Sequence, residues 1–422
     1  MKSYLVWIFG LMCSANVALS QSRDTLRLNV DEAEQQFVKN NLTLLAQKYN
    51  IEASKAAIIQ AKLLPNPNIN YEQGLNTMKT IANDAPIGAF GERTLQIQQL
   101  ILLAGKRNKQ VNVAKINAEI TDYQFFEIVR GLTYQLHASF YTIHYLQKTL
   151  ATYEQEIETL NKLLSAYSDQ VARGNVPQKE LIRLQSFLVS LETERSNIIL
   201  EITDNQAVLK VLLSDTSTKT VHPIVDDNAL EQKSAAGLQL SELINSATDN
   251  RYDRKIQEAT VRLASADLAL QKAMATPDLT IGYSYDRAGS YLNNYHGLTI
   301  AMDLPVFNKN QGNIKIAENT IQANKQNLAQ TDVQINNDVL QALLKAQEAE
   351  RLYKTLDKNY LPSFNKLIDG VVQNYQKRNI TLLEFMDFLE SYKITVTQIN
   401  TLQNTRMQTF ENLNFVVGKK VL

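Results

Sequence analysis

The chain of 422 residues carries nearly the same pattern twice, and this duplication constrains its fold more than any other feature. Residues 61–71 (AKLLPNPNINY) resemble residues 273–283 (AMATPDLTIGY). Further along, residues 171–176 (VARGNV) align with residues 375–380 (YQKRNI). We therefore expect one structural unit, repeated within one chain, that runs helix, two short strands and two very long helices.

The duplication also suggests how the chain is divided. We predict four segments, namely a signal peptide at 1–20, a first repeat at 21–213, a linker at 214–241 and a second repeat at 242–422. The predicted β-hairpins lie at about 66–103 and about 278–307.

Long helices are the strongest local prediction. Apolar residues step alternately by four and three positions along one segment, as in a coiled-coil heptad seam: Leu146, Leu150, Tyr153, Ile157, Leu160, Leu164, Tyr167 and Val171. A helix from Lys106 to Ala172 would be about 100 Å long at 1.5 Å per residue. Gly (14) and Pro (8) together make about 5% of the chain, against about 12% in average proteins, so turns are rare. Two antiparallel coiled-coil hairpins are expected.

Four short segments alternate between apolar and polar residues, as β-strands with two different faces do. In one of them Leu279, Ile281 and Tyr283 alternate with Thr280 and Gly282. Such strands suit a sheet half-buried in a soluble domain or a sheet facing lipid. An export signal, long polar hairpin loops and tyrosines near the strand ends favour the membrane.

The first twenty residues read as an export signal. Lys2 precedes an apolar run from Tyr4 to Met12, and Ala18-Leu19-Ser20 resembles a cleavage site. An alternative that stays open is a lipoprotein signal, in which Cys13 would be the lipidated cysteine.

Composition excludes several classes of function. The 43 basic and 43 acidic residues balance, so no nucleic-acid partner is expected. Cys13 is the only cysteine, and the four histidines show no metal-ligand spacing. His137 and His144 lie seven residues apart and could share one face of a helix, but no carboxylate or thiol completes a catalytic triad or a metal site with them. We therefore predict no catalytic residues, no metal site, no cofactor and no enzymatic activity.

If the four strands meet lipid, they cannot close a barrel alone. Every backbone donor and acceptor must be paired in hydrocarbon, and membrane barrels begin at about eight strands. Three chains would supply twelve strands and leave room for an aqueous lumen. The predicted fold class is mostly α with a small membrane β part: a homotrimeric 12-stranded β-barrel in outer-membrane lipid, standing on an α-helical barrel.

The chain resembles the TolC-like outer-membrane factors of tripartite efflux and type I secretion systems, over nearly its whole mature length. The residues that carry the resemblance are the duplicated layout, the entry to the first strand (LLPNPN, 63–68), the strand exits (LILLAGKR, 100–107, and LPVFNKNQG, 304–312) and the RGNV turn at 173–176. The strand exits are most similar to the heavy-metal branch, which is CzcC- or CusC-like. The resemblance implies an outer-membrane channel with a periplasmic helical extension.

The resemblance also implies functional residues and partners. In the family the two helix-hairpin turns form periplasmic tips where a membrane-fusion adaptor docks, linked to an inner-membrane pump. The matching tip positions are Arg173, Gly174, Asn175, Val176, Arg378, Asn379, Ile380 and Thr381. The family's closed-state gate matches Glu180 facing Tyr375, and its acidic entrance ring matches Glu384 and Asp387. These acidic residues could also be solvated positions on a coiled coil.

Two departures from the family pattern concern the second turn. Arg378-Asn379 replaces a usual Gly-Thr pair, and Ile380 stands where a basic gate residue is usual.

The alternative function is an exported periplasmic coiled-coil adaptor or scaffold, which would share the export signal and the heptads. The sequence does not reveal whether the transported substrate is a metal ion or a drug, because no cluster of Met, Cys or His residues would select a metal.

Overall fold

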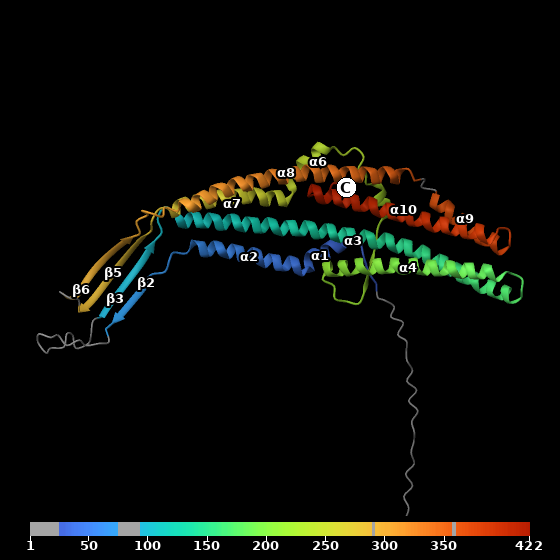
Figure 1. Cartoon of the computed structure of the whole chain (residues 1–422), viewed down its shortest axis with the longest axis horizontal. Coiled ribbons are helices and arrows are strands. Elements are labelled where there is room, and N and C mark those ends of the chain that lie inside the picture. The colour runs from blue at the N-terminus through green and yellow to red at the C-terminus, as the bar shows by residue number, and fades with distance from the viewer. Residues whose placement is uncertain (1–24, 75–92, 289–291, 357–359) are drawn as a thin grey trace, which may run out of the picture.

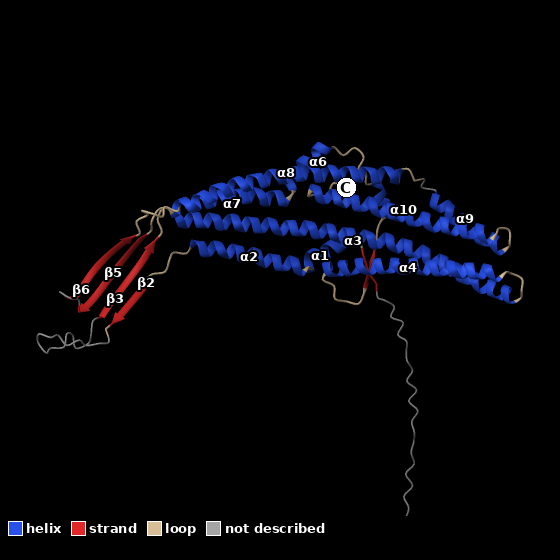
Figure 2. Cartoon of the chain, in the orientation of Figure 1, coloured by secondary structure: helices blue, strands red, loops and turns tan. Residues whose placement is uncertain are grey.

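We describe the protein from a computed structural model, which describes residues 25–74, 93–288, 292–356 and 360–422. The predicted signal peptide and Cys13 lie outside the described residues. The described chain is a long rod of helices with a β-sheet at one end and two helix turns at the other (Figure 1). Figure 2 shows that the larger sheet lies beyond one end of the helices, whereas two short strands lie beside them near the middle of the rod.

In the described residues of the first half there are three strands and four helices. Its elements are β1 (Thr25–Leu28), α1 (Val30–Asn40), α2 (Leu42–Lys62), β2 (Asn68–Gln73), β3 (Arg93–Ile101), α3 (Lys106–Ala172) and α4 (Gln178–Leu213). At 67 residues, α3 runs from the sheet to the far turn (Figure 1). A helix of this length is about 100 Å long, as the heptad pattern predicts.

The rest of the chain repeats this order with short additions. Its elements are β4 (Thr220–Pro223), α5 (Asp227–Gln232), α6 (Leu240–Asn250), α7 (Tyr252–Met274), β5 (Leu279–Ala288), β6 (Asn293–Met302), α8 (Gln311–Lys354), α9 (Tyr360–Gln376) and α10 (Leu382–Val417). The prediction of two very long helices is wrong for this half, because the first of them is split into α8 and α9. Pro362 lies in the first turn of α9, where its missing N–H has no helical partner to lose.

Four strands form one antiparallel sheet in the order β2-β3-β5-β6. The central pairing joins the two halves of the chain, because β3 pairs with β5. The register places Ile69 opposite Ile97, Ile97 opposite Tyr283, and Tyr283 opposite Leu298. Side chains directly opposite one another share a face of a sheet, so most apolar residues of the four strands line one face. Leu100 is an exception, because it lies opposite Thr280 on the other face.

The segment between the halves is more than a connection. β4 pairs in parallel with β1 in a separate two-stranded sheet, which the sequence analysis did not predict. Val221, Leu230 and Ala235, all from residues 214–241, are buried in the main hydrophobic core. This segment therefore helps to bind the two halves together near the middle of the rod.

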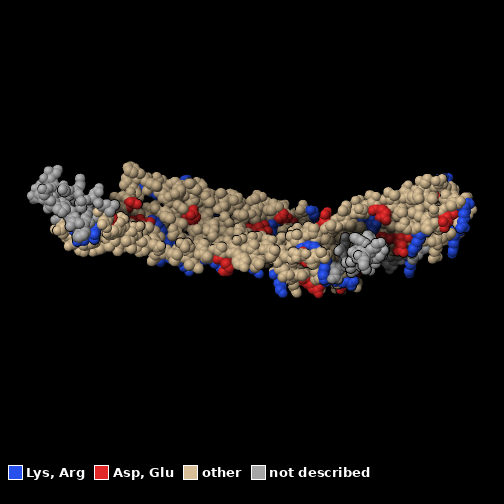
Figure 3. Space-filling view, turned by 90° about the horizontal axis from the view of Figure 1, so that it is seen from below, with Lys and Arg blue, Asp and Glu red and all other residues tan. Residues whose placement is uncertain are grey.

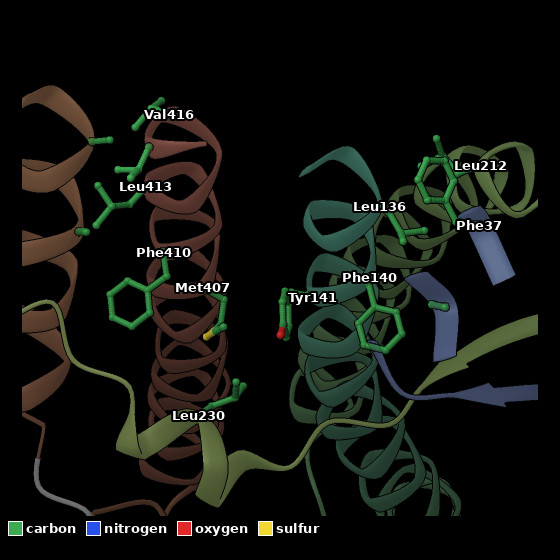
Figure 4. Close-up of a cluster of buried hydrophobic side chains, with 14 of the residues drawn as sticks. Phe37, Leu136, Phe140, Tyr141, Leu212, Leu230, Met407, Phe410, Leu413 and Val416 are labelled. Atoms are coloured by element: carbon green, nitrogen blue, oxygen red, sulfur yellow. The ribbon is translucent and has the colours of Figure 1, made fainter. Parts of the chain in front are cut away.

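Buried apolar side chains form two clusters along the helices. The larger cluster lies near the middle of the rod, where Phe140 of α3 and Phe410 of α10 are fully buried. In Figure 4, Tyr141 and Met407 point toward one another between these helices, with Leu230 of α5 below them. The second cluster lies toward the turns and joins α3, α4, α9 and α10. None of the described helices combines the length and the apolar character needed to span a membrane.

Candidate functional site at the paired helix turns

The turn between α3 and α4 is built on a left-handed glycine. Gly174 has a φ of +75°, and the N–H of Asn175 donates to the carbonyl of Gln170 at 2.9 Å. The Asn175 side chain repeats this link by donating to the Gln170 side chain at 2.9 Å. Glycine adopts this backbone conformation without strain and closes helix C-termini in this way.

The turn between α9 and α10 copies this backbone without the glycine. Arg378, at the position of Gly174 in the repeat, has a φ of +61°. The N–H of Asn379 donates to the carbonyl of Asn374 at 2.9 Å, and the Asn379 side chain donates to the Asn374 side chain at 3.1 Å. The departure from glycine noted in the sequence therefore leaves the turn geometry intact, at the cost of a left-handed arginine.

The two turns lead into the next helix differently. Pro177 precedes α4 and forms no side-chain cap. Thr381 caps α10, and a reciprocal capping box joins it to Glu384: the Thr381 N–H donates to the Glu384 carboxylate at 2.8 Å, and the Glu384 N–H donates to the Thr381 hydroxyl at 3.3 Å. Hydrogen bonds from the backbone and side chain of Thr381 hold the pKa of the exposed Glu384 carboxyl below its ordinary value.

Tyr375 is held by aromatic stacking. Its ring lies between Tyr167 of α3, at 5.7 Å between ring centroids, and Phe385 of α10, at 4.3 Å. Burial, together with the adjacent Tyr167 hydroxyl and the charge of Glu180, raises the pKa of the Tyr375 hydroxyl. Among the described residues the buried Tyr375 hydroxyl has no hydrogen-bond partner, so no hydrogen bond joins it to Glu180. Because Tyr167 belongs to the first helical hairpin and Tyr375 and Phe385 to the second, the stack connects the two hairpins of one chain.

The remaining predicted residues lie at the same end of the rod. Most tip side chains are exposed to solvent, and only Val176 and Ile380, which occupy equivalent positions in the two repeats, are half-buried. Asp387 is exposed on α10, one helical turn after Glu384. Basic side chains are prominent at the tip end of the face shown in Figure 3, whereas both signs mix along the rod.

Sequence reasoning missed the stacking partners and the cap. Tyr167 was recognised only as a position of the heptad seam, and Glu384 only as an acidic residue. The run Thr381-Leu382-Leu383-Glu384 is a capping-box pattern, so the sequence did contain that signal. The stack has no equivalent signal, because it depends on how three helices meet.

The opposite end of the rod carries an uncovered apolar face. Ile69 is 67% exposed, Leu298 83% and Ile300 75%, all on the apolar face of the sheet. The sheet projects beyond the ends of the helices (Figure 1), so none of the described helices covers this face. The polar face carries asparagine, glutamine and threonine, which suits contact with water.

Groups suited to metal binding do not converge at either end. Within the residues that the structure describes, no three His, Cys, Asp or Glu side chains form a candidate metal site.

The two ends, an exposed apolar sheet and a pair of helix turns joined by a long helical rod, are the features to compare with known classes of protein. A family model described as outer membrane efflux protein matches residues 33–213 and 243–419, and the chain belongs to this family. It is therefore an outer-membrane component of efflux with a periplasmic helical extension, and it is not an enzyme.

Individual relatives share the length and fold of the chain. It is 20% identical over 352 residues to the cobalt-zinc-cadmium resistance protein CzcC of Cupriavidus metallidurans, covering 82% of this chain and 80% of CzcC. Crystal structures of CusC match with a TM-score of 0.72 and 18% identity, over 95% of this chain and 96% of CusC. The CmeC outer membrane channel of Campylobacter jejuni matches with a TM-score of 0.77 and 12% identity, over 92% and 85% of the two chains.

These findings confirm the predicted family and the mostly helical fold with a small β part; the closed trimer and its contact with lipid belong to the proposal below. They also decide between the two predicted functions in favour of the efflux channel over a periplasmic adaptor or scaffold. The residue roles at the tips and the gate, like the segment boundaries, stay predictions.

Proposed function

We propose that three copies of the chain close one 12-stranded barrel in outer-membrane lipid and one helical conduit beneath it. The observation that carries this proposal is the apolar face of the four-stranded sheet, which is left uncovered by the helices that the structure describes. An apolar face of this kind exposed to water would be costly, because apolar surface contributes about 25 cal/mol per Å² when removed from water. Lipid would cover it.

The edges of the sheet support the same proposal. β2 and β6 each pair on one side only within the described chain. Unpaired backbone groups cannot remain in hydrocarbon, so β2 of one copy would pair with β6 of the next. Three such junctions close the barrel without any further strand.

At the other end, we assign adaptor docking to the two turns. Their backbones are equivalent, and three copies would present six similar turns to a periplasmic adaptor coupled to an inner-membrane pump. The gate would lie here as well, with Glu384 and Asp387 on the lumen side and the Tyr167–Tyr375–Phe385 stack holding the hairpins of each chain together.

The cargo would be set by the pump, with the channel acting as a passive conduit. Similarity to a cobalt-zinc-cadmium resistance protein favours divalent metal ions, and similarity to CmeC keeps drug efflux as the other candidate. Co-purification of the adaptor and pump, followed by growth of cells on zinc or on a drug panel, separates the two.

The membrane proposal is tested with a pair of neighbouring substitutions on β6. Ile300→Asp places a charge on the apolar face and is expected to hinder insertion if that face meets lipid, at a cost below the roughly 2–4 kcal/mol of an Arg or Lys at the bilayer midplane. Thr299→Asp, on the polar face, is the matched control. We expect membrane-extracted, heat-modifiable trimers from the control and a strong loss from Ile300→Asp. Equal yields would contradict the proposed lipid face.

The gate proposal is tested by single-channel conductance. Tyr375→Ala removes the stacked ring and is expected to raise resting conductance, whereas Tyr375→Phe keeps the ring and is expected to leave it near wild type. Glu180→Ala is expected to have little effect, because no hydrogen bond joins it to Tyr375. A large effect of Tyr375→Phe would instead assign the gate to the hydroxyl.

A further inference from the structure

A carboxyl group with no hydrogen-bond partner lies inside the helical bundle above the turns. Glu156 of α3 is 3% exposed, and neither of its carboxyl oxygens has a hydrogen-bond partner among the described residues. It precedes Gly174 by 18 residues, which is about 27 Å along the helix. Its surroundings come from both hairpins, with α3 and α4 from the first and α10 from the second.

The charged groups that face Glu156 are already paired with one another. Lys393 of α10 is 4% exposed and forms ion pairs with Glu194 of α4 and Glu390 of α10, both at 2.9 Å. The Tyr153 hydroxyl of α3 donates to Glu194 at 2.8 Å. Lys393 is therefore the one cation named here for three carboxyl groups, and its ion pairs go to Glu194 and Glu390 and not to Glu156. Glu194 and Glu390 also reach solvent.

Glu156 is the carboxyl group that this arrangement leaves without compensation. An ionised carboxylate in a dry site without a partner costs several kcal/mol, so the neutral acid is favoured while the helices stay packed. Burial raises the pKa of Glu156 to about 8, and the charges of Glu390 and Glu194 act in the same direction against the opposing charge of Lys393. Below that pH, Glu156 carries a proton.

We propose that Glu156 is a proton-dependent switch on the seam between the two hairpins of each chain. When protonated, it allows α10 to pack against α3 and α4. When ionised, it draws water into the seam and loosens α10. The proposal rests on the gated-channel function proposed above, because loosening α10 would ease movement of the turn that follows α9.

The direction of the pH effect follows from the raised pKa. In the unfolded or open chain Glu156 would ionise near its ordinary value of 4.5, whereas in the packed seam it stays protonated to about pH 8. The seam is therefore most stable below pH 4.5 with respect to this group. It loses stability as pH rises from 4.5 to 8 and changes little above that.

Hydrogen exchange of the detergent-solubilised full chain tests the switch between pH 6 and 9.5. At each pH, wild type is compared with Glu156→Gln, which cancels the intrinsic pH dependence of exchange. We expect amides of α10 around Lys393 to exchange at least tenfold faster in wild type than in Glu156→Gln at pH 9, and Glu156→Leu to match Glu156→Gln. Glu154→Gln, at an exposed position of α3, is the control and should follow wild type.

Equal protection in wild type and both Glu156 variants at pH 9 would overturn the switch. Channel recordings on the same samples keep its failure separate from failure of the proposed function. Channel currents with flat protection would refute the switch alone. A pH-dependent loss of protection without channel currents would support the switch and refute the conduit.

Discussion

The two helix turns of this chain share a backbone and differ in how their side chains stabilise it. The first uses Gly174 in the left-handed region and enters α4 through Pro177, which forms no side-chain cap. The second places Arg378 in the same conformation and compensates with a capping box and an aromatic stack. Duplication therefore fixed the path of the chain, while each copy acquired its own stabilising contacts.

The largest expected difference between the turns comes from the stack. Phe385→Ala removes a fully buried ring beneath Tyr375 and is expected to cost about 3–4 kcal/mol of local opening free energy. Leu181→Ala, at the equivalent but half-buried position of α4, is expected to cost about 1–2 kcal/mol. Hydrogen exchange of the turn amides measures both, and equal losses would show that the stack does not distinguish the turns.

The left-handed position should respond in opposite directions. Gly174→Ala is expected to destabilise its turn by about 1–2 kcal/mol through backbone strain alone, because the added Cβ would meet no atom within 4 Å. Arg378→Gly should stabilise the second turn by roughly 0.5 kcal/mol, because relief of a left-handed strain of about 1–2 kcal/mol is partly offset by the entropy that glycine gains in the unfolded chain. The same exchange experiment reports both signs. Loss of stability in Arg378→Gly would show that the arginine side chain makes a contact worth more than the strain.

Removing the cap should affect one turn only. Thr381→Ala deletes the hydroxyl that accepts from the Glu384 N–H and is expected to cost about 1 kcal/mol at the start of α10. Pro177→Ala removes no cap and should change the start of α4 by only a few tenths of a kcal/mol. Protection of the first-turn amides of the two helices checks this, with similar effects arguing against the capping box.

The smallest expected effect is a pH dependence confined to the second turn. Because the pKa of Glu384 is lowered by its bonds to Thr381, the stabilisation is present above the unfolded value of 4.5 and is lost as pH falls through the lower folded pKa. Glu384→Gln keeps a capping side chain and should abolish this dependence. A wild-type α10 terminus with protection unchanged between pH 6 and 3 would contradict the assignment.

Features set by local periodicity were predictable from the sequence. The heptad seam of α3 and the alternation along the strands each repeat over many residues, and they gave the long helices and the two-faced sheet. The left-handed Arg378 also follows from its alignment with Gly174. What the sequence did not show depends on distant packing: the pairing of β1 with β4, the stack around Tyr375, and the lack of a partner for Glu156.

The most direct test of the account is the mass of the intact complex, measured by native mass spectrometry after extraction from the outer membrane. We expect a single species of three chains that needs detergent to stay in solution, because three copies supply the twelve strands that leave room for an aqueous lumen, whereas two copies would supply eight strands around an interior filled with side chains. A stable single chain in detergent-free buffer, with its sheet packed against its own helices, would contradict the account.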